Sequence, residues 1–282
     1  MSAATAAAAD PVAAAPPRPG PVPFLRGARV VFDLSLEAML WSRRSVFMGL
    51  LLVVPLLFAI LYRVLLAAHA PVRITPALFF GGMFGSYYIW FALPLTALFY
   101  ATALVADEVE AKTITYLLTR PVRRTSILLG KFAAYLGTTL ALVLPSVVLT
   151  FFVLMTRQGR RGLALGAPDL VRDLAVAALA LLAYGALFTF VGVLLRWPLI
   201  TGLLFLYGWE WLSILPGWAP RLTIRAWLTS MHHHTVVGEG LSQGVVQTLP
   251  VVPGLITLFT SSLLFLALAA WIFSRRQYVL DQ

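Results

Sequence analysis

The sequence predicts an all-α integral membrane protein with six transmembrane helices, and its composition and apolar segments support this. Of the 282 residues, 60% are hydrophobic and 11% are charged, and the mean hydropathy is +0.89. A water-soluble domain cannot bury so much apolar surface, so a lipid bilayer must cover the rest. Six apolar segments approach the roughly 20 residues that a helix needs to cross the hydrocarbon core. They run from Val46 to Ala68, Leu78 to Ala106, Ile127 to Met155, Leu174 to Leu195, Leu199 to Leu215 and Val251 to Phe273, within a transmembrane domain at 46–274.

The distribution of cations indicates that both termini are cytosolic. Lys and Arg number 21 against 11 Asp and Glu, and an N-terminus inside places thirteen of the 21 on the cytosolic side and eight outside. The outside cluster RQGRR, at 157–161, weakens this bias. No basic tract is interleaved with aromatic residues, so we expect no nucleic-acid partner. The absence of cysteine excludes disulfides and thiol chemistry.

The N-terminal region divides into two parts. Residues 1–25 are rich in Ala and Pro, and we interpret them as a disordered cytosolic tail. Residues 26–45 alternate apolar and charged side chains at helical spacing, which predicts an amphipathic helix in the membrane interface. An ordinary cytosolic helix is the alternative. At the other end, 275–282 form a short cytosolic tail.

The most polar stretch, DEVEAKTITYLLTRPVRRTSILLGK, runs from Asp107 to Lys131 and contains the cytosolic loop at 107–126. Asp107 and Glu110 have the spacing of a capping box, so a new helical segment is expected to begin there. Ile114, Leu117 and Leu118 form a small apolar stripe on a short helix that Pro121 ends. Such a stripe in a ring of charge is suited to a groove on a soluble partner. A solvated connector with arginines that fix the topology is the plainer interpretation.

This stretch resembles the signature of ABC type-2 permeases, the membrane subunits of ATP-binding-cassette transporters. The residues that carry the resemblance are Glu108, Glu110, Thr113, Leu117, Leu118, Pro121, Arg124 and Lys131. Lys112 departs from the pattern, where glycine is expected. The resemblance implies that the loop, including Ile114 and Arg120, is a coupling helix that docks on a nucleotide-binding subunit.

The resemblance also sets the expected partners and cofactors. No G-x-x-x-x-G-K-[ST] motif occurs, so we expect no cofactor on this chain, with ATP and Mg²⁺ held by a separate ATPase subunit. The family further implies a homodimer, or a pair with a related permease, surrounded by membrane lipid. Its members are chiefly exporters, and the Ala- and Arg-rich composition suggests a bacterial inner membrane.

The segment at 216–250 is predicted to lie outside, before the last span. Leu222, Ala226, Trp227 and Leu228 suggest a short amphipathic helix at the outer interface, anchored by Trp218 and Trp227. His232, His233 and His234 raise the possibility of a metal. Adjacent helical residues diverge by about 100°, so three in a row do not converge on one ion. We therefore predict no metal site here.

Glu210 is the acidic residue well inside an apolar segment, which makes it a candidate pathway residue. A structural ion pair, for example with Arg63, is the equal alternative. Three functions remain open at this stage: a transporter subunit, a membrane scaffold or assembly factor that uses the same ATPase mechanically, and a membrane enzyme acting on lipid-linked substrates. The family resemblance favours the transporter subunit. The enzyme is disfavoured because, apart from Glu210 and the histidine run, the sequence shows no convergent catalytic constellation.

Overall fold

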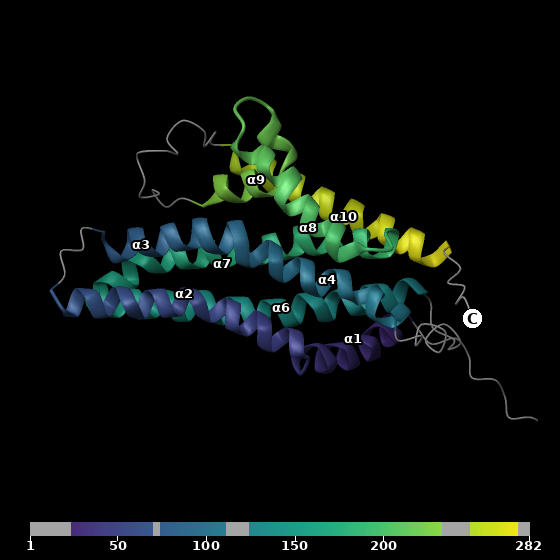
Figure 1. Cartoon of the computed structure of the whole chain (residues 1–282), viewed down its shortest axis with the longest axis horizontal. Coiled ribbons are helices and arrows are strands. Elements are labelled where there is room, and N and C mark those ends of the chain that lie inside the picture. Colours follow the sequence, from purple (N-terminus) through teal and green to yellow (C-terminus); the bar gives the residue numbers. More distant parts are fainter. Residues whose placement is uncertain (1–23, 70–73, 111–123, 233–248, 276–282) are drawn as a thin grey trace, which may run out of the picture.

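The computed structural model describes residues 24–69, 74–110, 124–232 and 249–275, and in these residues the chain is helical without strands. The long helices lie side by side (Figure 1), with α4 and α6 packed on α7, and α2 packed on α6. The elements are α1 (Phe24–Leu40), α2 (Arg43–Ala67), α3 (Pro76–Met83), η1 (Phe84–Ala92), α4 (Leu93–Glu110), α6 (Arg124–Met155), η2 (Thr156–Gln158), α7 (Gly159–Leu194), α8 (Pro198–Gly208), η3 (Trp209–Ile214), η4 (Ala219–Leu222), α9 (Ile224–Met231) and α10 (Val251–Arg275).

Five helical segments in the described residues are long and apolar enough to cross a membrane. They are 43–67, 76–104, 125–155, 159–194 and 251–275, which correspond to predicted spans one to four and six. The most hydrophobic windows of 43–67 and 251–275 have only 22% and 17% of their residues buried within the protein. Because the exposed remainder is mostly apolar, these two helices present a surface suited to lipid.

The predicted fifth span, Leu199–Leu215, does not form a helix of spanning length. Its first part is the 11-residue α8, and from Trp209 the chain tightens into the 3₁₀ helix η3. Pro198 provides the first turn of α8, where its missing N–H costs nothing. The count of six continuous spans is therefore not confirmed in the described residues.

The first residue of α1 and the last residue of α10 lie on the same side of the molecule. In Figure 1, α1 begins and α10 ends at the right, whereas α8 runs back from the end of α7 toward α9. This arrangement agrees with two termini on one side of a membrane. That this side is the cytosol stays a prediction.

The predicted N-terminal helix is present as α1, and it packs along α6. Gly130 allows this contact, because a Cβ there would lie 2.6 Å from the carbonyl oxygen of Ala28. The chain then breaks at Trp41 and Ser42, and the Ser42 side chain caps α2. The other face of α1 exposes Val30 and Leu34, but its place in a membrane interface stays a prediction. The proposed tails fall largely outside the described residues.

The second span contains a π-helix, η1, between α3 and α4. Pro94, the second residue of α4, has no N–H to donate to the carbonyl of Trp90, which disturbs the regular α-helical ladder at this point. Buried hydroxyls fix η1 to its neighbours: Tyr88 bonds to Ser146 of α6 at 2.7 Å, and Ser146 donates to the carbonyl of Leu52 in α2 at 2.6 Å. This network holds the widened helix in one register.

Candidate functional site

The predicted coupling loop lies between the end of α4 and the start of α6. Glu108 and Glu110 are in the last turns of α4, and Arg124 is the first residue of α6. The remaining predicted loop residues fall outside the described part of the chain: Thr113, Ile114, Leu117, Leu118, Arg120 and Pro121. Their contacts with a partner stay a prediction.

The predicted helix start at Asp107 is wrong. Helix α4 continues through Asp107 to Glu110 without a break. A residue in the interior of a helix has its own N–H bonded within the helix, so Asp107 is not an N-cap. Helix α4 of the second span therefore extends into the predicted loop as far as Glu110.

Lys131 joins the two helices that flank the loop. Its side chain is 8% exposed, and Nζ donates a hydrogen bond to the carbonyl oxygen of Leu104 in α4 at 2.9 Å. Leu128 and Phe132 of the same helix are buried around it. A buried cation is costly unless it is hydrogen-bonded, so this contact fixes α6 against α4 close to the loop.

A second group of polar residues lies around α9. Glu210 of η3 is fully buried, and its carboxylate accepts hydrogen bonds from the backbone N–H groups of Ile224 at 3.3 Å and Arg225 at 3.1 Å. These N–H groups belong to the first turn of α9, where the helix dipole favours a negative charge. Thr223 adds a side-chain cap to the N–H of Ala226. Glu210 therefore fixes the start of α9.

Arg225 lies in the same buried group. Its guanidinium donates to the backbone carbonyl of Glu210 at 3.3 Å and lies 4.2 Å from the ring centre of Trp90 in η1. The suggested pairing of Glu210 with Arg63 is wrong, because Arg63 bonds instead to Val153 and Thr156 of the α6–η2 corner. The cation near Glu210 comes from α9, which follows it closely in the sequence.

His232, directly after α9, connects this helix to two others. Its Nδ1 lies 3.2 Å from Oδ1 of Asp173 in α7, and its Nε2 lies 2.9 Å from the carbonyl oxygen of Gly81 in α3. Both side chains are buried, at 3% and 0% exposure, and the imidazole also packs on Phe84. No cluster of three metal-ligating residues occurs in the described ranges, and His233 and His234 lie outside them.

Together these contacts place buried polar groups at both ends of α9, which we call the buried polar centre and define as Glu210 and Arg225 at its start and Asp173 and His232 after its end. The carbonyl of Gly81 and the 39% exposed ring of Trp90 contact this centre. It attaches α9 to α3, η1 and α7. The predicted short helix is present at 224–231, and its place on the outer side stays a prediction. Trp227 is buried, with its indole donating to the carbonyl of Arg221 at 2.9 Å. The side chain is enclosed by protein, so Trp227 is not the outer anchor that was predicted.

Of the residues in this centre, Glu210 was predicted from the sequence, whereas Asp173 and Arg225 were not. Asp173 lies just before the predicted fourth span, and Arg225 lies in a segment predicted to be surface-exposed. Only the extension of α7 back to Gly159 places Asp173 within a spanning helix. The sequence feature that could have identified Asp173 is its position as an acidic residue directly before a long apolar segment.

Comparison with known proteins identifies the family to which the chain is similar. Residues 34–208 match the model of the family described as "ABC-2 family transporter protein", and this match includes the loop and extends through α8. A search of curated protein sequences found no match.

Proposed function

The chain belongs to the ABC-2 family of transporter proteins, and we propose that it is the membrane subunit of an exporter driven by a separate ATP-binding-cassette subunit. Multiple membrane-spanning helices and the family assignment support a permease. ATP and Mg²⁺ would be bound by the partner, since the chain lacks the phosphate-binding motif expected for ATP. We propose export, and a bacterial inner membrane, on the basis of the family resemblance and the composition.

One structural observation supports ATP coupling most directly. The segment from α3 through η1 to α4 carries Gly81 and Trp90, which contact His232 and Arg225 of the buried polar centre, and, farther along, Leu104, which binds Lys131 beside the loop. Gly81 and Leu104 are 23 residues apart, roughly 35 Å at the rise of an α-helix. A displacement of the loop by a closing ATPase would therefore move a helix that ends at the polar centre.

In the proposed assembly, two copies of this chain, or one copy and a related permease, bind two ATPase subunits. The loop at 107–126 would dock on the ATPase through Ile114, Leu117 and Leu118, with Glu108, Glu110 and Arg120 at the margin. The helix α9 would change its contacts with α3 and α7 as the pathway opens. Such a transition requires differential binding of ATP to the two states.

The test is purification of the tagged full chain from its native membrane in mild detergent, with mass spectrometry of the proteins that co-elute and an ATPase assay. We expect a stoichiometric ATP-binding-cassette subunit and hydrolysis of ATP. Reconstitution of that complex in vesicles then tests transport. Hydrolysis without transport of any lipid, peptide or drug supplied would favour a scaffold or assembly factor, and a chain free of ATPase would contradict the proposal.

A further inference from the structure

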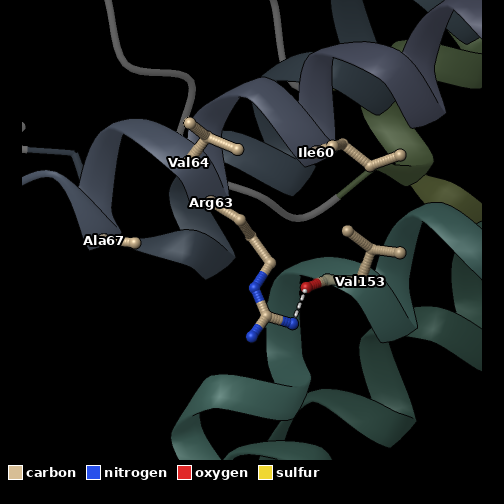
Figure 2. A pocket seen from close by; sticks show the side chains of 5 residues that line it. All are labelled: Ile60, Arg63, Val64, Ala67 and Val153. Atoms are coloured by element: carbon tan, nitrogen blue, oxygen red, sulfur yellow. Dashed lines mark hydrogen bonds between the residues drawn. The ribbon is translucent and has the colours of Figure 1, made fainter.

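An apolar groove with one cationic side chain lies between α2 and α6, away from the buried polar centre. It has a volume of about 590 Å³ and is lined by Ile60, Arg63, Val64 and Ala67 of α2 and by Val153 of α6. Figure 2 shows the Arg63 side chain extending from α2 toward α6, with its guanidinium beside the carbonyl of Val153. Apolar walls and a terminal cation thus share one groove.

The guanidinium is only partly satisfied by the protein. Nη1 donates to the carbonyl oxygen of Val153 at 2.9 Å and to Oγ1 of Thr156 at 2.6 Å. Within the described ranges, neither Nε nor Nη2 of Arg63 has a hydrogen-bond acceptor, and no carboxylate forms an ion pair with this residue. The two bonds fix the guanidinium plane and leave one edge of its planar fork for an acceptor from outside the chain.

The surroundings identify the chemistry of that acceptor. Helix α2 exposes a continuous apolar surface beside the groove, formed by Leu57, Phe58, Ile60, Leu61, Val64 and Leu65. Arg63 is four residues before the end of this spanning helix, a position where arginine reaches the headgroup layer. Arg160 and Arg161, both exposed, follow Thr156 along the chain by about one turn. The groove therefore combines a lipid-facing wall with a cationic end.

We propose that this groove is a binding site for one anionic phospholipid, with the lipid phosphate on the free edge of Arg63 and an acyl chain between Ile60, Val64 and Val153. A guanidinium binds phosphate oxygens in two parallel hydrogen bonds, which an ammonium group does not reproduce. A soluble anion would use the cation but not the apolar walls. The proposal does not depend on the transport function.

Native mass spectrometry of the delipidated full chain tests this site, with phosphatidylglycerol as the probe and phosphatidylcholine and inorganic phosphate as comparisons. We expect one phosphatidylglycerol to bind more tightly than phosphatidylcholine, and inorganic phosphate not to displace it. Arg63→Gln should weaken binding roughly fivefold, the contribution of about one cation at a membrane surface. Arg63→Lys should recover only part of the loss.

The matched control is Arg172→Gln, which removes an exposed arginine of α7 whose nearest acid is Asp169 at 4.0 Å. It should leave lipid binding unchanged.

A second variant, Ala67→Trp, fills the groove without altering charge, so it should also weaken phosphatidylglycerol binding. It tests the proposed site if Arg63→Gln does not fold. Equal affinity in wild type, Arg63→Gln and Ala67→Trp, or full displacement by inorganic phosphate, would overturn the proposal.

Discussion

The imidazole of His232 and the carboxyl group of Asp173 lie 3.2 Å apart, although 59 residues separate them in the sequence. The carbonyl of Gly81 can only accept a hydrogen bond, so Nε2 of His232 must carry a proton. A hydrogen bond between Nδ1 of His232 and Oδ1 of Asp173 requires a second proton, which is bound to one of these two atoms. The pair is therefore either imidazolium with carboxylate or neutral imidazole with carboxylic acid, and it has no net charge in either form.

Removing Asp173 should destabilise the protein. In Asp173→Leu, His232 loses a buried partner, and we expect the free energy of unfolding to fall by about 1–3 kcal/mol. Denaturation of the purified chain in mixed micelles measures this change. The matched control is Asp169→Asn, an exposed acid of the same helix, which should change stability by less than about 0.5 kcal/mol. Equal effects at the two positions would argue against a stabilising role for the buried pair.

Substitution of Glu210 distinguishes a helix cap from a pathway charge. The N–H groups of Ile224 and Arg225 bond to different oxygens of Glu210, so Glu210→Gln keeps one of these two acceptors, whereas Glu210→Leu keeps neither. We expect Glu210→Leu to lose about 1–2 kcal/mol more stability than Glu210→Gln, the usual cost of removing an N-cap. We also expect Glu210→Gln to retain most transport activity in reconstituted vesicles. A stable Glu210→Gln protein without transport would instead support the pathway interpretation.

Most of the helical architecture could be predicted, because a spanning helix leaves a long apolar run in the sequence. The exception is the predicted fifth span, Leu199–Leu215. Trp209, Trp211 and Leu212 continue the apolar run of α8, so hydropathy alone gives no sign that the α-helix stops at Gly208. Directly after this stop, Glu210 of η3 bonds to the first turn of α9, a tertiary contact that the sequence of α8 does not reveal.

The candidate site was less predictable than the helices. A single acid in an apolar run drew attention to Glu210, but its neighbours Trp90 and Arg225 are brought together by the packing of η1 against α9. Lys131 was identified only through the family resemblance. Nothing in its local sequence indicates that its partner is the carbonyl of Leu104 in another helix.

The close contact between α1 and α6 predicts that Gly130 does not tolerate a side chain. In Gly130→Ala the new Cβ would lie 2.6 Å from the carbonyl oxygen of Ala28, and a backbone atom cannot rotate away. We expect a loss of about 1–3 kcal/mol in unfolding free energy. Gly49→Ala is the control, because a Cβ there meets no atom within 4 Å, and it should be neutral or stabilising. Equal stability of both variants would show that α1 does not pack on α6 in this way.

Lys131 should affect coupling without affecting assembly. Lys131→Met keeps much of the side-chain length but removes the donor to Leu104, and a hydrogen bond from a charged group contributes about 1.5–3 kcal/mol. We expect the variant to bind the ATPase subunit normally, while transport per ATP hydrolysed falls by roughly tenfold. The measurement is the rate of transport and the rate of ATP hydrolysis, determined side by side in the same vesicles.

The control for Lys131→Met is Leu129→Met, at a partly exposed position of the same helix, which should behave as wild type. Loss of ATPase binding in Lys131→Met would mean that the residue contributes to docking instead.

The docking role of the loop predicts that charge on its apolar stripe prevents assembly. Leu117→Asp combined with Leu118→Asp should leave expression and membrane insertion intact, because both residues lie between the apolar segments that the sequence predicts to span the membrane. Burying two carboxylates in an apolar groove of the partner is strongly unfavourable, so co-purification of the ATPase should fall at least tenfold. Tyr116→Asp combined with Thr119→Asp adds the same charge on the opposite side of the expected short helix and should retain most binding. If both double variants lost the ATPase equally, added negative charge alone would explain the result. If both retained it, the partner would have to dock elsewhere on the chain.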